Sequence, residues 1–387
     1  MTGKTAELRI HNTRSLLHEL MLSGAMSRAE IARKLHVSKP TVGEITTELL
    51  ERGLIREIDT VNPANRGRGR PSTPIQLDNN VPRILLIQIG IHETRLAATP
   101  LLVDDADDWD IATPTPSSMP KFRQALTKAI RQLPTRELLG MVISVPGLVD
   151  EPEGRSIFSP NLHWLANSRL IENLQTILAI PTVLIQEIRA LALGQQIQHG
   201  DDNFLLVDVD HGLGGAAVIN GRLFDAPLPI AMEIGHAQVP RQHQRCGCGG
   251  TGCLETIFSM GGLLRTWNSH QQPRFRKWEQ LAEYLHNQPD RPHDWITSTL
   301  DAAGAVIGGT LNTIGTKRVV FTGAASNLPT RYQQKLTEEV SRHSLWSRLA
   351  EIECVFEQRY RMRGMVASGM DRLVQPLADS VVHHVAS

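Results

Sequence analysis

The sequence predicts a small helical N-terminal domain followed by a larger α/β body. The chain has 387 residues, a length that suggests two or three domains. Two capped helical patterns joined by a short turn lie within the first fifty residues. Beyond residue 84, short β-rich runs alternate with helical patterns, which is typical of an α/β architecture.

The N-terminal helices are predicted from apolar spacing and capping residues. A first helix covers 12–22, where leucines recur at helical spacing. Ser27 with Glu30 three residues later forms a capping box at the start of a second helix. Ser38 caps a third helix that carries Pro40 in its first turn and ends at Gly53.

This layout predicts a helix-turn-helix in which the helix capped by Ser38 enters the DNA major groove, although a helical protein-interaction module would give a similar pattern. The N-terminal residues of this recognition helix face base edges, and nearby arginines face phosphates. The candidate DNA-binding residues here are Arg28, Ser38, Lys39, Thr41, Gly43 and Glu44.

A polar, turn-rich tract over 62–73 is interpreted as a wing plus linker. It contains Arg66, Arg68 and Arg70 spaced by glycines, so the backbone can approach a minor groove closely while arginine favours its negative potential. A solvated flexible linker is the alternative.

The α/β body is predicted from β-rich runs that alternate along the chain with helical patterns. The β-rich runs are 84–90, 138–146, 182–186, 204–209, 216–219 and 318–322, and the helical patterns are 121–133, 168–179, 189–198 and 296–314. We expect strands and helices in this order.

Charge and hydropathy exclude several classes of protein. The 40 basic and 40 acidic residues cancel overall, but 1–72 holds 12 Lys or Arg against 8 Asp or Glu. A nucleic-acid partner is therefore expected at the N-terminus only. No run approaches the length of a membrane span, and 1–10 lacks a signal-peptide core, so a soluble cytoplasmic protein is expected.

Three of the four cysteines crowd into eight residues. Cys246, Cys248 and Cys253 lie on a glycine-rich stretch, with His236 ten residues upstream as a possible fourth ligand. Zn²⁺ prefers four tetrahedral nitrogen and sulfur ligands, so one structural zinc per chain is predicted. Three incidental buried thiols are the alternative.

The motif Glu233-Ile-Gly-His236, followed by the three cysteines and Leu254-Glu255, resembles the signature of the ROK family of sugar kinases and sugar-responsive repressors. Further matching segments are Val145-Pro-Gly147, Ser159-Pro-Asn161-Leu162, Asp210–Gly215 and Val320–Gly323. The resemblance implies a two-lobed actin-like body. It also implies that a sugar's hydroxyls are bound by Asn161, Glu187, Glu233, His236 and Glu255, with His236 also ligating zinc.

The sequence departs from ROK kinases at three places. The first phosphate turn, Asp-x-Gly-Gly-Thr in kinases, reads Gln88-Ile-Gly90-Ile-His92, and the second carries Asp210 and His211 where kinases have Gly and Thr. A carboxylate there repels nucleotide phosphates. The Asn-Asp pair that supplies the kinase base is replaced by Gln186 and Glu187. No catalytic residue is therefore expected.

These observations predict a winged helix-turn-helix over 1–80, a first lobe over 81–194 plus 375–387, and a second lobe over 195–374 that carries the zinc loop and the dimer interface. The predicted function is a repressor of carbohydrate uptake or catabolism genes. Its expected partners are operator DNA, a second or further copies of the chain as a dimer or tetramer, and a sugar, sugar phosphate or sugar-transport protein. An ATP-dependent sugar kinase with an appended DNA-binding domain, or a body that senses only a protein partner, remain alternatives.

Overall fold

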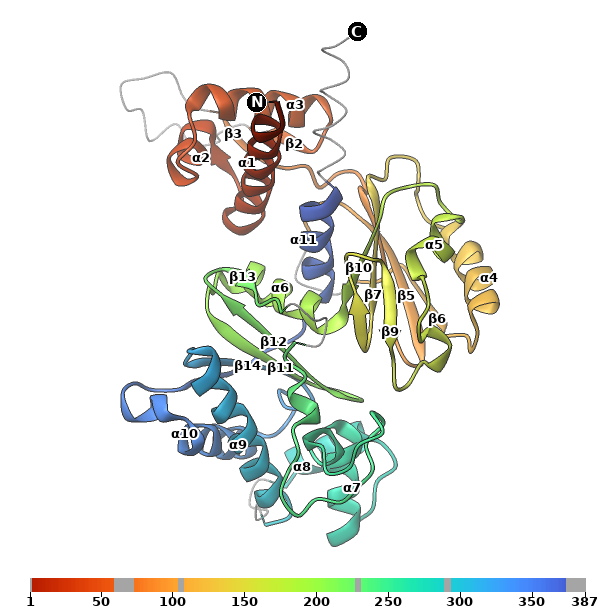
Figure 1. Cartoon of the computed structure of the whole chain (residues 1–387), viewed down its shortest axis with the longest axis vertical. Helices are drawn as coiled ribbons and strands as arrows, with labels where there is room; N and C mark the ends of the chain where they lie inside the picture. Colours follow the sequence, from red (N-terminus) through yellow and green to blue (C-terminus); the bar gives the residue numbers. More distant parts are fainter. Residues whose placement is uncertain (1, 59–72, 104–107, 227–230, 289–293, 374–387) are drawn as a thin grey trace. The chain divides into compact units, whose positions relative to one another are not determined.

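The computed structural model describes residues 2–58, 73–103, 108–226, 231–288 and 294–373 (Figure 1). The chain divides into two compact units, each described separately below. Unit 1 comprises Met1–Gly200 and Tyr360–Ser387, and unit 2 comprises Asp201–Arg359.

Three helices open unit 1, as predicted, and the first begins at Thr2 rather than at residue 12. They are α1 (Thr2–Ser23), α2 (Arg28–Lys34) and α3 (Lys39–Glu51). The Ser27 hydroxyl accepts the Glu30 amide while Glu30 accepts the Ser27 amide, so the capping box is confirmed. The Ser38 hydroxyl accepts the Thr41 amide at 3.3 Å, which fixes the start of α3.

A three-stranded antiparallel sheet completes this domain. Its strands are β1 (Met26–Ser27), β2 (Ile55–Glu57) and β3 (Pro74–Leu77), in the order β1-β3-β2. The strands β2 and β3 flank the predicted wing, whose tract falls almost entirely within 59–72 and so lies outside the described residues. The domain is a winged helix-turn-helix.

The body of unit 1 is a five-stranded sheet between two helical layers. The strands are β4 (Ile84–Ile89), β5 (Glu93–Thr99), β6 (Ile111–Pro114), β7 (Gly140–Val145) and β10 (Thr182–Gln186), in the order β10-β7-β4-β5-β6. The apolar cluster on one face includes side chains of α4 (Met119–Ile130) and α5 (Leu170–Gln175). The cluster on the other face includes α6 (Glu187–His199) and α11 (Arg361–Leu373), as Figure 1 also shows. A hairpin of β8 (Leu148–Asp150) and β9 (Arg155–Phe158) and the short helix η1 (His163–Leu165) follow β7.

Unit 2 holds a second five-stranded sheet. Its strands are β11 (Phe204–Val209), β12 (Leu213–Ile219), β13 (Arg222–Leu223), β14 (Arg318–Gly323) and β15 (Glu353–Phe356), in the order β13-β12-β11-β14-β15. Its helices are α7 (Met260–His270), α8 (Trp278–His286), α9 (Thr297–Ile314) and α10 (Thr330–His343), with the short helices η2 (Ile234–His236), η3 (Leu254–Thr256) and η4 (Leu345–Arg348). The core of the unit is one apolar cluster around Trp267 and Phe321.

The two sheets share one topology. In each sheet, the first strand lies at the centre. The second strand pairs antiparallel with the first, and the third pairs antiparallel with the second. On the other side of the first strand, the fourth pairs parallel with it and the fifth pairs parallel with the fourth. This duplicated order gives the two α/β lobes that the predicted fold class requires.

The predicted lobe boundaries differ from the structure. The second lobe was expected over 195–374, but 195–200 and α11 belong to unit 1. The reason is close packing: a Cβ on Gly364 of α11 would lie 2.7 Å from the amide nitrogen of Gly194 on α6, so these two helices form one layer. The expected return of 375–387 to the first lobe falls outside the described residues.

The described helices lack the combination of length and apolar character that a membrane-spanning segment needs.

Candidate functional site

The predicted metal ligands converge in unit 2. His236 ends η2, and Cys253 directly precedes η3, while Cys246 and Cys248 come from the loop between them. The loop folds back through the backbone bond from the Cys246 amide to the Gly250 carbonyl at 2.9 Å. Gly252 has φ +74° and a Cβ there would lie 2.5 Å from the Gln242 carbonyl, so this turn requires glycine.

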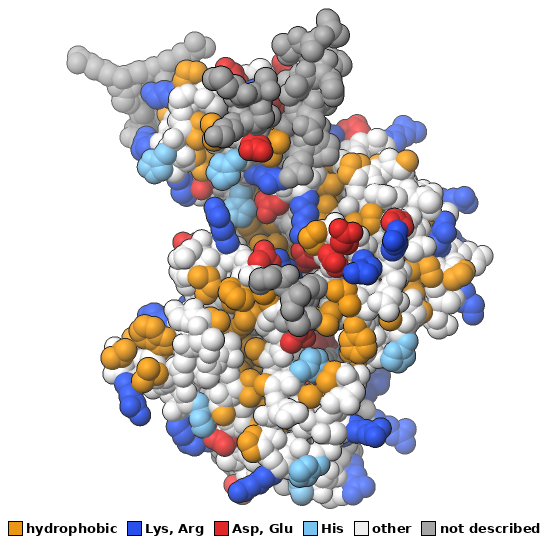
Figure 2. All heavy atoms as spheres, in the orientation of Figure 1, with side chains coloured by type: hydrophobic (Ala, Val, Ile, Leu, Met, Phe, Trp, Pro, Cys, Tyr) orange, Lys and Arg blue, Asp and Glu red, His pale blue; other side chains and the backbone are white. Residues whose placement is uncertain are grey.

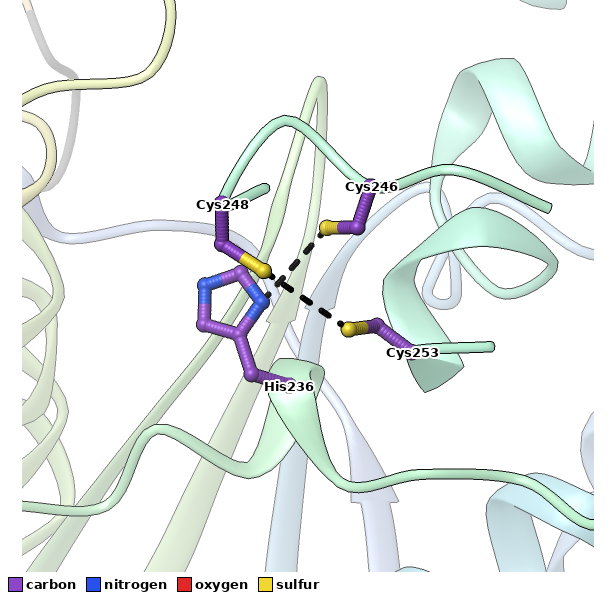
Figure 3. A group of neighbouring side chains, drawn as sticks. All are labelled: His236, Cys246, Cys248 and Cys253. Atoms are coloured by element: carbon purple, nitrogen blue, oxygen red, sulfur yellow. Dashed lines mark hydrogen bonds between the residues drawn. The ribbon is translucent and has the colours of Figure 1, made fainter. Parts of the chain in front are cut away.

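The spacing of the four ligand atoms fits a tetrahedral metal. The four side chains point toward a common centre (Figure 3), and their ligand atoms lie within 4.8 Å of one another. The Cys248 and Cys253 sulfurs are 3.8 Å apart, and the Cys246 sulfur is 3.6 Å from Nδ1 of His236. A zinc tetrahedron with Zn–S bonds of about 2.3 Å and a Zn–N bond of about 2.0 Å has edges of about 3.8 and 3.5 Å.

Protonation of these thiols depends on their surroundings. Desolvation raises the pKa of the Cys246 and Cys253 thiols. The backbone hydrogen bond from Gly250 lowers the pKa of Cys248. Three sulfurs and one imidazole form the donor set of structural zinc sites, and all four tetrahedral positions would be taken by the protein.

Two of the predicted sugar-binding carboxylates adjoin this cluster. Oε2 of Glu233 lies 3.8 Å from Nε2 of His236, the ring nitrogen opposite the cluster. Oε1 of Glu255 accepts a hydrogen bond from the Cys246 sulfur at 3.5 Å, and its Oε2 accepts the Leu213 amide at 3.0 Å. Glu255 therefore ties the cysteine loop to the glycine-rich turn at 210–215.

The other two predicted sugar-binding residues lie in unit 1. Asn161 is exposed and precedes η1, and Glu187 begins α6 directly after β10. Oε1 of Glu187 accepts hydrogen bonds from Nε2 of Gln88 at 2.9 Å and from Nε of Arg361 at 3.1 Å.

A second arginine holds two carboxylates of unit 2, one on β11 and one in the glycine-rich turn at 210–215. Arg359 forms a bidentate pair with Asp208, at 2.7 and 3.0 Å, and an ion pair with Asp210 at 2.7 Å. Asp208 also accepts the Thr322 hydroxyl at 2.6 Å. Arg359 and Arg361 carry no local sequence pattern that predicts their roles, because their partners are 151 and 174 residues away.

The predicted DNA-binding residues cluster at the start of α3. Ser38, Lys39 and Glu44 are exposed, and Thr41 and Gly43 are half-buried. The Ser38 and Thr41 hydroxyls lie 2.8 Å apart. A Cβ on Gly43 would meet no atom within 4 Å, so this face of α3 is open.

Arg28 is engaged within the domain rather than presented freely. Its Nε donates to the Thr46 hydroxyl at 3.0 Å, and its Nη2 pairs with Glu57 at 2.9 Å. Arg28 thus joins α2, α3 and β2. Arg66, Arg68 and Arg70 lie outside the described residues.

A winged helix-turn-helix followed by two α/β sheets of like order defines a protein of the helix-turn-helix class with an actin-like, sugar-kinase-like body. The chain belongs to the ROK family, whose family model matches residues 84–375. The MarR family model matches residues 13–61, which cover α2, α3 and the second half of α1.

Among curated proteins, the chain is similar to transcriptional regulators. It is 31% identical over 250 residues to the DNA-binding transcriptional dual regulator NagC of Escherichia coli, covering 62% of this chain and 60% of NagC. It is 22% identical over 364 residues to the xylose repressor of Caldicellulosiruptor bescii, covering 88% of this chain and 90% of the repressor. The chain thus spans less than two thirds of NagC but most of the xylose repressor.

Solved structures of similar fold include a regulator and a kinase. A ROK family transcriptional regulator, described as a homologue of the E. coli Mlc protein, superposes with a TM-score of 0.77 at 21% identity, covering 96% of this chain and 98% of that one. The ROK hexokinase of Thermus thermophilus superposes with a TM-score of 0.61 at 19% identity, covering 76% and 99%. At these identities the likeness shows the fold alone.

Proposed function

We propose that the protein is a sequence-specific transcriptional regulator that represses carbohydrate uptake or catabolism genes and responds to a sugar, sugar phosphate or sugar-transport protein. The observation that carries the proposal is the open start of α3 in a winged helix-turn-helix joined to a ROK body. The names of NagC and the xylose repressor support the same function.

Operator binding is tested on the full chain. A DNA site selected from a random duplex pool should be two-fold symmetric, because a homodimer presents two heads. Lys39→Ala should weaken binding and lower the slope of log affinity against log salt by about 1 if the lysine contacts a phosphate. Lys121→Ala is the matched control, since Lys121 is an exposed lysine that also adjoins a proline in the first turn of its helix.

The result that contradicts this part is equal operator affinity for both lysine variants and for Thr41→Ala. Deleting 1–78 is a less clean test, because α1 packs against α11 and its removal would expose apolar surface of the body.

One structural zinc per chain is part of the proposal. The four ligands would hold the zinc, and the bound zinc would order the cysteine loop at 246–253. The metal would therefore stabilise the fold and would not take part in catalysis. Elemental analysis of protein purified without chelator should give one zinc per chain, with most of it lost in Cys248→Ser. Cys354→Ser is the control because Cys354 lies on β15, outside the cluster. Absence of zinc from the parent protein would contradict the proposal.

Sugar binding is proposed for Asn161, Glu187, Glu233, His236 and Glu255. A thermal-shift screen of glucose, xylose, N-acetylglucosamine and their phosphates should find a stabilising ligand, since a ligand at 100 times its Kd adds about 2.7 kcal/mol. Glu255→Gln should abolish that shift, whereas Glu172→Gln, at an exposed carboxylate on α5, should not. If no sugar shifts the melting temperature, a protein partner becomes the better effector.

Kinase activity is not expected. The supporting observations are that Glu187 is held by Gln88 and Arg361 and that Asp210 occupies the second predicted phosphate turn. Phosphoryl transfer depends on positioning and charge stabilisation around the nucleotide phosphates. An assay with ATP, Mg²⁺ and the same sugars should therefore stay at background. Turnover that disappears in Glu187→Gln would instead favour the kinase.

A homodimer is proposed through unit 2. Leu345 and Leu349, on and next to η4, expose 59% and 74% of their surface. Figure 2 shows hydrophobic side chains gathered at the edge of the unit that carries α10. Exposed apolar patches often mark protein interfaces. Leu349→Glu should lower the sedimentation-derived mass if this edge forms the dimer, and an unchanged mass would place the interface elsewhere.

A further inference from the structure

The helix α11 contacts both a predicted effector residue and the DNA-binding domain. Its first residue, Arg361, binds Glu187 of α6. Farther along, α11 packs against α1, the first helix of the winged domain. All of these elements belong to unit 1.

The Arg361–Glu187 pair is nearly enclosed. The Arg361 side chain is 6% exposed and that of Glu187 is 24% exposed. Nε and Nη2 of Arg361 both bind Oε1 of Glu187, at 3.1 and 2.9 Å, and Gln88 binds the same oxygen at 2.9 Å. Oε2 is therefore the oxygen left to accept a ligand hydroxyl. A ligand that hydrogen-bonds to Oε2 and moves the carboxylate must also change the hydrogen bonds between Oε1 and the enclosed arginine.

Close backbone packing makes α6 and α11 move together. A Cβ on Gly364 would lie 2.7 Å from the carbonyl carbon of Ala190 and from the amide nitrogen of Gly194. Because the two backbones are this close, rearranged side chains between the helices cannot compensate for a displacement of the start of α11. The whole of α11 is displaced instead.

The far part of α11 shares a core with the winged domain. Leu16, Leu17 and Leu20 of α1 are at most 1% exposed and belong to the same apolar cluster as Met365 and Met370 of α11. The same cluster extends to the buried side chains of α2 and α3. The helix that binds Glu187 is thus in continuous apolar contact with the domain that carries the proposed recognition helix.

We propose that α11 couples effector binding at Glu187 to the position of the DNA-binding domain, with Arg361 as the positioning residue that senses the carboxylate. The inference rests on the proposed function. In one state Arg361 holds Glu187 and α11 supports α1. In the other, the effector competes for Glu187, α11 shifts, and α1 loses contacts. An effector acts through this helix because it binds the two states with different affinity.

The test compares Glu187→Gln, Arg361→Gln, Arg361→Lys and the Glu187→Gln/Arg361→Gln double variant in the full chain, without any effector. Operator affinity and hydrogen exchange of α1 amides are measured. Each of the two glutamine variants should weaken operator binding by between about 5-fold and 150-fold, the usual range of coupling between sites. Their α1 amides should exchange faster. The double variant should be no weaker than the weaker single variant, because both remove one pair. Arg361→Lys should recover part of the affinity.

The matched control is Arg169→Gln, which removes an arginine paired with Glu172 at 3.1 Å in the same unit but away from α11. It should bind the operator within two-fold of the parent. Additive losses, or parent-like affinity and exchange in both glutamine variants, would overturn the coupling while leaving the regulator function intact. If the parent binds no selected DNA, the regulator function fails and α1 exchange alone decides the coupling. If Arg361→Gln does not fold, Glu187→Gln and Arg361→Lys carry the comparison.

Discussion

Replacing Gly364 with alanine should destabilise unit 1 by overpacking α6 against α11. The added Cβ would lie 2.7 Å from the Ala190 carbonyl carbon and from the Gly194 nitrogen, whereas relaxed contacts are about 3.5 Å or longer. The Ala190 carbonyl oxygen would lie closer still, so the helices must separate by more than about an ångström or the local backbone must distort. Overpacking of this kind costs about 1–3 kcal/mol.

Thermal unfolding followed by circular dichroism measures the effect. A loss of 1–3 kcal/mol in a unit of this size corresponds to a fall in Tm of roughly 2–12 °C. Gly309→Ala is the control, because Gly309 is an exposed residue within α9 whose Cβ would meet no atom within 4 Å. That variant should be stabilised by about 0.5–1 kcal/mol through helix propensity. Equal or higher Tm in Gly364→Ala would refute the close-packing argument.

Ser27, Cys354 and Thr322 can each be tested by a measurement on one side chain. Ser27→Ala should cost about 1 kcal/mol in denaturant unfolding of the winged domain by removing the capping box. The Ser27 hydroxyl lowers the pKa of Glu30 from 4.5, so this stabilisation is present above that pH and should fade as the pH falls through the folded pKa. Burial raises the pKa of Cys354 to about 11, so roughly a thousandth of it is thiolate at pH 8, and iodoacetamide should label it readily only in urea. Thr322→Val should cost about 1–3 kcal/mol of unfolding free energy, because it removes a 2.6 Å hydrogen bond to the charged, buried Asp208 carboxylate, whose Oδ1 then keeps only its bond from Arg359.

The sequence by itself determined the features that depend on neighbours along the chain. Ser27 and Ser38 cap their helices as predicted, because a capping hydroxyl binds an amide only three residues away. The candidate metal ligands were identified for a similar reason, since all four fall within eighteen residues and glycines allow the loop to close. The central strands of both sheets were found from their continuous apolar runs.

The weaker patterns were missed. Helix α10 carries only a few apolar residues, four positions apart, and strand β15 has only four residues, so neither stands out from loops in the sequence. The common order of the two sheets was also invisible, because topology can be duplicated while the side chains that encode it diverge.

Only the tertiary structure decided what α11 does. Its sequence gives no reason to assign it to unit 1, and we placed it in the second lobe; its glycines instead fit the backbone of α6. The tertiary structure also pairs Arg361 with Glu187 and Arg359 with Asp208, and the residues of each pair are more than 150 positions apart. Local propensity and residue spacing report only on neighbours along the chain, so they cannot predict contacts at this separation.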